Sequence, residues 1–138
     1  MRVLAGTSGF SYDGWTGTFY PEDLPAAERL GYYAKKLPAV EINNTFYRMP
    51  KPELLAGWAA QVPESFSFAL KASQRITHIK RLKDVSEEVR YLLGAARHLG
   101  GHLGPILFGL PPNLKKDVPR LEAFLALPVS YTHPTLPT

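Results

Sequence analysis

Apolar residues recur along the chain with two alternating periods, one typical of strands and one typical of helices. In residues 66–71, Phe66, Phe68 and Leu70 alternate with small or polar residues, which is the period of a strand. In residues 24–37 the apolar positions recur at helical spacing, and Pro38 follows them. The two patterns predict strands at residues 3–6, 40–43, 66–71 and 105–110, and helices at residues 24–37, 52–62, 84–99 and 117–125.

The strict alternation of strands and helices predicts a parallel sheet joined by right-handed crossovers. An open doubly wound sheet and a (β/α)8 barrel both fit this order. The two faces of the strands favour the barrel: Val40 and Ile42 oppose the polar Glu41 and Asn43. Doubly wound strands are covered by helices on both faces and should be apolar on both. The expected fold class is therefore α/β, of the (β/α)8 TIM-barrel type, here with about four βα units.

Several residues predict where the third helix lies. Asp84 and Glu87 have the spacing of a capping box, which predicts a helix start at Asp84. Gly100 and Gly101 predict its end. Residues 72–83, before this helix, are predicted to form a basic loop.

Composition narrows the class of protein. The 138 residues are 45% hydrophobic, which suits one packed domain, and they contain no cysteine, which excludes disulfides and thiolate zinc sites. The formal charge of +4 permits an anionic ligand without requiring one. The sequence has neither an apolar run of membrane-spanning length nor a signal-peptide core, so we expect a cytoplasmic protein without membrane association.

The last ten residues differ in character from the rest. Residues 129–138 contain three threonines and two prolines without a helical or strand period. They resemble the translation of a transposase sequencing adaptor, a contaminant at the ends of metagenomic gene sequences; the alternative is a natural Pro/Thr-rich tail. We expect residues 129–138 to be an artefactual non-native tail and residues 1–128 to be the N-terminal half of a TIM-barrel domain. Such a truncated fragment would expose the edges of its first and last strands and self-associate through them.

Five sequence blocks together resemble one family. They are residues 6–12 with Trp15 and residues 19–21, residues 40–47, residues 66–72, residues 76–78 and residues 107–112. In this order they resemble the YecE-like family, domain of unknown function 72, over about residues 2–127. The resemblance implies a TIM barrel about twice this length and no established reaction. The family usually has glutamine where Gly109 stands, so a polar side chain is missing at the end of the fourth strand.

Glu41 and Lys71 are the first candidates for a site, because active sites of barrels lie at the C-terminal ends of the strands. Both are expected on the inward face of neighbouring strands, where a buried carboxylate requires a partner, so we expect them to meet. A structural ion pair explains this equally well. In the functional interpretation Glu41 is a general base or metal ligand, and Lys71 anchors an anion.

Other polar and aromatic residues surround this predicted pair. Asn43 and Asn44 offer amide groups, although asparagine is also common in turns. We expect Phe46, Tyr47, Trp15 and Tyr20 to form an aromatic wall for a sugar or a base, or else to pack loops onto the barrel. The predicted catalytic residues are Glu41, Lys71 and His78, and the predicted ligand-binding residues are Ser8, Trp15, Tyr20, Asn43, Asn44, Tyr47, Arg75 and Thr77.

Three functional hypotheses follow. The first is a barrel-mouth pocket that binds a phosphate-bearing or polyhydroxyl ligand, with acid–base or metal-assisted hydrolase or isomerase chemistry. Its cofactor is unknown, and no motif supports the divalent metal that this chemistry permits. The second is a non-catalytic nucleic-acid-binding protein, in which the basic loop and the aromatic residues hold a single strand. The third is a fragment without activity of its own.

Overall fold

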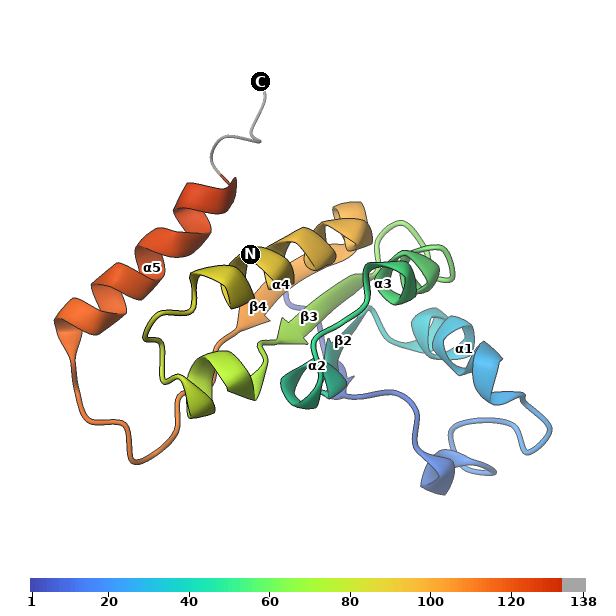
Figure 1. Cartoon of the computed structure of the whole chain (residues 1–138). Helices are drawn as coiled ribbons and strands as arrows, with labels where there is room; N and C mark the ends of the chain where they lie inside the picture. Colours follow the sequence, from blue (N-terminus) through green and yellow to red (C-terminus); the bar gives the residue numbers. More distant parts are fainter. Residues whose placement is uncertain (133–138) are drawn as a thin grey trace.

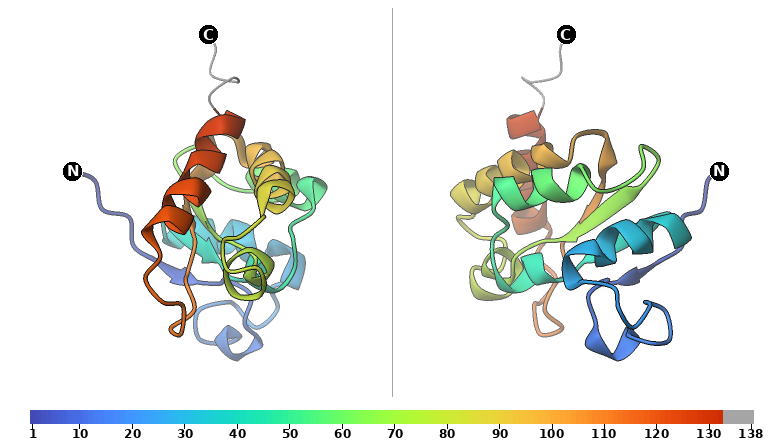
Figure 2. Two further views of the ribbon diagram at one scale, coloured as in Figure 1. Left: turned by 60° about the vertical axis from the view of Figure 1, so that its left-hand side comes forward. Right: turned by 90° about the vertical axis from the view of Figure 1, so that its right-hand side faces the viewer.

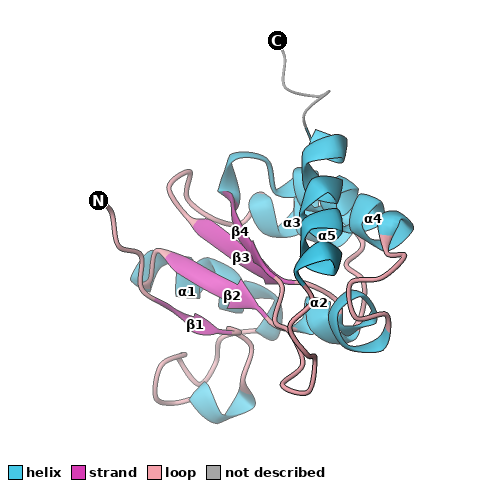
Figure 3. Ribbon diagram, turned by 90° about the vertical axis from the view of Figure 1, so that its left-hand side faces the viewer, coloured by secondary structure: helices cyan, strands magenta, loops and turns pink. Residues whose placement is uncertain are grey.

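The computed structural model describes residues 1–132 as a four-stranded parallel sheet with helices packed on it (Figure 1). The strands are β1 (Gly6–Ser8), β2 (Ala39–Ile42), β3 (Ser67–Lys71) and β4 (Leu103–Leu107). Figure 3 shows them side by side in the order β1-β2-β3-β4. The α-helices are α1 (Arg29–Lys36), α2 (Asn44–Tyr47), α3 (Pro52–Ala59), α4 (Ser86–Ala96) and α5 (Val118–Thr132). The predicted parallel α/β fold is confirmed.

One face of the sheet is buried by helices. Val40 and Ile42 on β2, and Phe68 and Leu70 on β3, are each at most 3% exposed and belong to one apolar cluster. Trp58 of α3 stacks on Phe68, with ring centroids 6.1 Å apart. The alternation in the sequence therefore predicted correctly which side chains face the helices.

The opposite face of the sheet is open. Side chains of Ser8, Glu41 and Ala69 lie in one row across β1, β2 and β3, because the strand register pairs these three positions. These residues line a hollow of about 440 Å³ on this face. The side chains in this row are therefore small or polar, as the sequence predicted.

A second apolar cluster lies under the C-terminal helix. Helix α5 runs beside α4 (Figure 2), and its Phe124 is 3% exposed. The ring of Phe108 meets that of Phe124 at 5.0 Å, edge to face. This contact attaches α5 to the segment that follows β4.

The boundaries of several elements differ from those predicted. Strand β1 begins at Gly6 rather than at residue 3, because its pairing with β2 starts at Gly6 and Ala39. Strand β4 covers Leu103–Leu107, two to three residues earlier than predicted. Gly104 allows this, because a Cβ there would lie 2.6 Å from Ser67 Oγ of β3. Helix α1 is shorter than predicted and follows a 3₁₀ turn, η2 (Ala26–Glu28).

The prediction of a loop over residues 72–83 and of a capping box at Asp84 was wrong. Residues Arg75–Ile79 form a π-helix, η3, with the Lys80 amide donating to the Arg75 carbonyl. Asp84 adopts a left-handed conformation with φ 54°, and α4 begins only at Ser86 without a side-chain cap. Buried Ile76 draws this segment into the protein, a tertiary effect that local spacing does not encode.

The ends of the last two helices also differ from the prediction. Helix α4 ends at Ala96, and the 3₁₀ helix η4 (Arg97–His102) contains the two glycines, with Gly100 at φ 57°. Helix α5 continues to Thr132, beyond the end predicted at residue 125, so it includes residues 129–132, which lack a helical period in the sequence. Residues 133–138 of the predicted non-native tail lie outside the described residues, and the assignment of that tail stays a prediction. No helix within residues 1–132 has both the length and the apolar character needed to cross a membrane.

Candidate functional site

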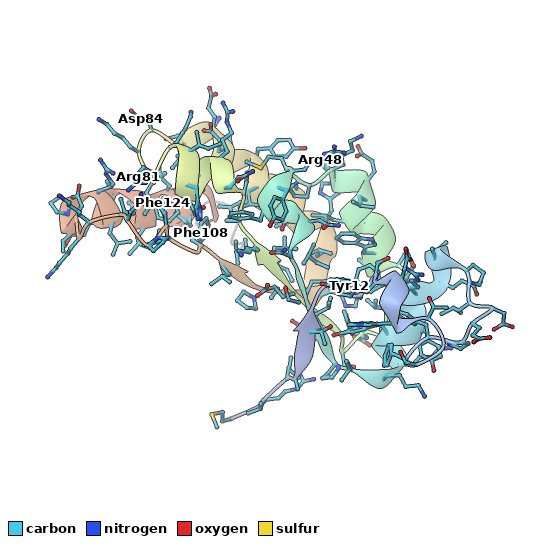
Figure 4. The ribbon with its side chains drawn as sticks, turned by 90° about the horizontal axis from the view of Figure 1, so that it is seen from below. Tyr12, Arg48, Arg81, Asp84, Phe108 and Phe124 are labelled. Carbon is cyan, nitrogen blue, oxygen red and sulfur yellow. The ribbon has the colours of Figure 1, made fainter. Side chains whose placement is uncertain are left out.

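The C-terminal ends of the four parallel strands lie at one edge of the sheet, which Figure 4 shows from below. Four segments follow the strands there, and Figure 4 labels a residue from each: Tyr12, Arg48, Arg81 and Phe108. In α/β proteins ligands bind at this edge, because loops from several strands meet there. The predicted site residues must therefore be located relative to this edge.

Ser8 and Glu41 meet on the open face. The Ser8 hydroxyl donates to Glu41 Oε1 over 2.9 Å. The contact follows from strand register, which pairs these residues near the ends of β1 and β2. The sequence nominated both residues, but not their bond.

The predicted contact between Glu41 and Lys71 was wrong. The strand register pairs Glu41 with Ala69, so Lys71 lies two residues further along β3, roughly 7 Å in the strand direction. Lys71 Nζ instead lies 4.6 Å from the centre of the Phe46 ring, in a cation–π contact. Within residues 1–132 neither Glu41 nor Lys71 forms an ion pair.

Phe46 also contacts His78. The two rings meet edge to face at 5.1 Å, and His78 Nδ1 is hydrogen-bonded to the Thr77 hydroxyl over 2.8 Å. Thr77 is fully buried, so it anchors the imidazole and leaves Nε2 out of that bond. The structure thus brings together Lys71, Thr77 and His78 around Phe46, at the C-terminal end of β3.

Thr45 holds helix α2 at this edge, and sequence reasoning did not single it out. It is 3% exposed, and its Oγ1 lies 3.0 Å from the Ile42 carbonyl and 2.6 Å from the Lys71 carbonyl. A shared hydroxyl donor therefore links the ends of β2 and β3. The only signal in the sequence was a threonine directly after a strand.

Replacing Thr45 with valine is expected to lower the free energy of unfolding by about 1 kcal/mol, because the buried Ile42 carbonyl and the partly buried Lys71 carbonyl lose their shared donor. Urea denaturation would measure this change. Thr18→Val is the matched control, since its hydroxyl bond to the Trp15 carbonyl is exposed. An equal loss in both variants would contradict the role assigned to Thr45.

The two asparagines directly follow β2 at this edge. Asn43 occupies the N-cap position of α2 with φ −88°, without a side-chain cap bond, and Asn44 is the first helical residue. Neither has the left-handed backbone that would explain them as turn residues. Both line a cleft of about 210 Å³ together with Ser11 and Tyr12. Their amides are therefore available to a ligand in this cleft.

Trp15 and Tyr20 lie in a packed aromatic cluster rather than on a ligand wall. Their rings are 5.9 Å apart, and Phe19 contacts both. Tyr20 is 2% exposed and donates its hydroxyl to the Phe10 carbonyl. Burial raises the pKa of Tyr20 to about 12, an effect that the nearby Arg29 partly offsets. Tyr47 differs from both, because it is 66% exposed.

The basic segment after β3 is partly neutralised by α4. Glu88 Oε2 lies 2.7 Å from Lys80 Nζ and 3.0 Å from Arg75 Nε. The hydrogen bond from Lys80, with a further one from Arg75, lowers the pKa of Glu88 to about 2. Arg81 donates to the side chain of Asn113. Arg75, predicted as a ligand-binding residue, therefore already has a carboxylate partner.

Across residues 1–132 no three histidine, aspartate or glutamate side chains are grouped so that they could hold a metal ion. The Glu41 carboxylate accepts a hydrogen bond from Ser8, whereas the His78 imidazole is hydrogen-bonded to Thr77, so these two side chains do not share a partner.

The parallel sheet, its polar open face and the charged groups at its C-terminal edge place this protein in the class of parallel α/β proteins. The chain belongs to the family described as protein of unknown function DUF72, whose sequence model matches residues 4–134. This confirms the family resemblance predicted from the five sequence blocks.

The relatives are longer than this chain. It is 30% identical to the UPF0759 protein YecE of Escherichia coli K12 over 103 residues, which cover 73% of this chain and 38% of YecE. It is 29% identical to the UPF0759 protein YunF of Bacillus subtilis 168 over 119 residues, or 77% of this chain and 42% of YunF. The chain thus spans less than half the length of these relatives.

Solved structures of the family have the same fold. A DUF72 family protein from Thermotoga maritima (TM1631) superposes with a TM-score of 0.72 at 28% identity, covering 95% of this chain and 52% of that one. A DUF72 family protein from Enterococcus faecalis (EF0366) gives 0.61 at 25% identity, covering 76% of this chain and 44% of that one.

Proposed function

We propose that the open face and C-terminal edge of the sheet form part of a pocket for a phosphate-bearing or polyhydroxyl ligand. The observation that carries this proposal is the separation of Glu41 and Lys71. Opposite charges lie on the same face of neighbouring strands, and each has a neutral partner, the Ser8 hydroxyl or the Phe46 ring. Neither charge neutralises the other, so both remain available to a ligand.

The two charged groups suit different parts of such a ligand. An ammonium group binds phosphate as a point charge, and a carboxylate accepts hydrogen bonds from sugar hydroxyls. The amides of Asn43 and Asn44 add donors and acceptors along the same edge. A phosphorylated sugar would match this set better than an uncharged sugar or inorganic phosphate alone.

Acid–base chemistry is part of the proposal. Glu41 serves as the general base, and His78, oriented by the Thr77 hydroxyl, serves as the group that donates or accepts a proton at Nε2. Proton transfer of this kind supports an isomerase or a hydrolase. The location of both residues near the C-terminal ends of β2 and β3 supports their assignment.

The proposed pocket belongs to a barrel. We infer that the four βα units correspond to half of a (β/α)8 barrel, with the open face of the sheet as its interior. The small and polar residues of that face and the two unpaired edges, β1 and β4, support this inference. In the longer relatives, further units would cover the open face and complete the pocket.

The nucleic-acid alternative receives less support from the geometry. Trp15 and Tyr20 are packed against each other, and Arg75 and Lys80 share Glu88. Stacking on nucleic acid requires exposed aromatic rings beside free cations. We therefore retain the small-ligand proposal.

Titration calorimetry with glucose 6-phosphate, glucose and inorganic phosphate tests this proposal. We expect Lys71→Met to lower the affinity for glucose 6-phosphate about tenfold or more, since a hydrogen bond to a charged group is lost. Glu41→Gln should weaken binding of both sugars and leave inorganic phosphate unchanged. The control Lys83→Met removes an exposed lysine elsewhere. Equal affinities in the wild type, Lys71→Met and Glu41→Gln would refute the proposal.

A further inference from the structure

A second hollow lies apart from the open face, on the surface between α2 and α3. It has a volume of about 470 Å³, which is within the range of small-molecule pockets. Its lining includes Tyr47, Arg48, Met49, Lys51, Leu54 and Trp58. We call it the α2–α3 groove. Neither Glu41 nor Lys71 lines it, so its charged groups differ from those of the proposed pocket, although Asn44 borders both the groove and the cleft beside that pocket.

The groove exposes apolar side chains that are close together. Tyr47 is 66% exposed and Leu54 is 49% exposed, and Met49 and the Trp58 ring lie beside them. Single exposed apolar residues are common on protein surfaces, but a group of them around a hollow is typical of a binding site. Two of the four are aromatic, which favours a flat ligand that can stack.

The charge of the groove has one sign. Arg48 and Lys51 lie on its lining, and no aspartate or glutamate lines it. Both cations are exposed, and within residues 1–132 neither forms an ion pair. An anionic group bound between them would therefore meet two unneutralised cations and no competing carboxylate.

The floor of the groove is held by tertiary contacts. Pro50 is buried, and its carbonyl accepts a hydrogen bond from the Tyr91 hydroxyl of α4 over 3.0 Å. Leu55 of α3 is fully buried, and Thr45 anchors α2 to the ends of β2 and β3. The backbone around the groove is therefore held before a ligand binds, which lowers the cost of binding.

We propose that the α2–α3 groove binds a small aromatic anion, with its ring between Tyr47, Leu54 and Trp58 and its negative group near Arg48 and Lys51. The argument is one of complementarity: an apolar, partly aromatic hollow with two cations matches a ligand that has a flat apolar body and one acidic group. The site does not depend on the function proposed for Glu41 and Lys71.

The test compares two dyes that differ mainly in one charge. 8-Anilinonaphthalene-1-sulfonate carries a sulfonate, and N-phenyl-1-naphthylamine has the same aromatic body without it. Fluorescence titration should show one saturable site that binds the sulfonate at least about tenfold more tightly, because only the sulfonate uses the two cations. The double variant R48Q/K51Q should lose this preference while it keeps the affinity for the neutral dye.

Three further variants separate binding in the groove from attraction to the protein's overall charge and from binding at the open face. K35Q/K83Q removes two exposed lysines outside the groove and should leave both affinities unchanged. K71M should also leave them unchanged, so failure of the proposed function and failure of the groove are distinguishable. Leu54→Ser removes an apolar wall and should weaken both dyes.

Two results would overturn the proposal. The first is an equal loss of sulfonate affinity in K35Q/K83Q and R48Q/K51Q, which would indicate attraction to the overall positive charge. The second is a dimer in sedimentation velocity that Leu54→Ser converts to monomer. This would assign the groove to a second copy of the chain.

Discussion

Replacing Gly6 with alanine is expected to separate β1 from β2 and to lower the free energy of unfolding by about 2–3 kcal/mol. A Cβ at this position would overlap the carbonyl of Ala39, the residue paired with Gly6 across the two strands. The Tyr33 hydroxyl donates to the same carbonyl over 2.8 Å, which leaves the oxygen little room to move. Urea denaturation would give the change in stability.

The site should respond together with the fold. When β1 moves, the hydrogen bond from the Ser8 hydroxyl to the Glu41 carboxylate is lost. The hydrogen bond from the Gly9 backbone amide to the Glu41 carbonyl is lost with it. Faster hydrogen exchange at the Gly9 amide would report this directly.

Gly57→Ala is the matched control. Gly57 lies inside α3, and a Cβ added there would have no neighbour within 4 Å, so alanine should stabilise the helix by about 0.5–1 kcal/mol. If both substitutions change stability by the same amount and in the same direction, the close approach of β1 and β2 is not the cause.

Glu88→Gln is expected to lower the free energy of unfolding at neutral pH by about 2 kcal/mol, since its carboxylate joins Lys80 and Arg75 to α4. The side chain of Glu88 is only 10% exposed, whereas Arg75 is 58% exposed and is screened by water. We therefore expect a smaller loss than the full pKa shift would imply.

The loss should depend on pH in a defined direction. The pKa of Glu88 falls from 4.5 to about 2 on folding, so the carboxylate stabilises the protein fully above about pH 4.5. That contribution disappears as the pH falls toward 2. Stability measured in urea from pH 7 to pH 2.5 should therefore show the wild type and Glu88→Gln converging at the acid end.

Glu87→Gln is the control for this measurement. Glu87 lies in the same first turn of α4 but is exposed, so its loss should cost only about 0.3 kcal/mol from the helix dipole. A constant difference between wild type and Glu88→Gln over the whole pH range would show that the ion pairs do not stabilise the fold.

Much of the candidate site could be nominated from the sequence, but its contacts could not. Ser8, Lys71 and His78 stand at or after the ends of predicted strands and Glu41 stands near the end of one, where parallel sheets place their ligand groups. The register of β2 against β3 then decided that Lys71 meets Phe46 instead of Glu41. A shift of two residues along a strand is too small for periodicity to reveal.

The neutralised basic segment shows the same limit. Arg75 and Lys80 have no acidic residue between them in the sequence, and their partner Glu88 comes from the next helix. The π-helix and the left-handed residues Arg81, Leu82 and Asp84 bring the chain back so that these groups meet. No local signal predicted that path.

The sequence by itself determined the alternation of strands and helices, the buried face of the sheet and the family. These depend on local periodicity and on motifs, because an apolar side chain at every second or every third to fourth position has one face to bury. Only the tertiary structure decided which groups are partners: Ser8 with Glu41, Lys71 with Phe46, and Glu88 with Lys80. It also formed the α2–α3 groove, whose walls meet because Thr45 and Tyr91 hold two helices in place. Such contacts depend on register and on the path of loops, which are properties of the folded chain as a whole.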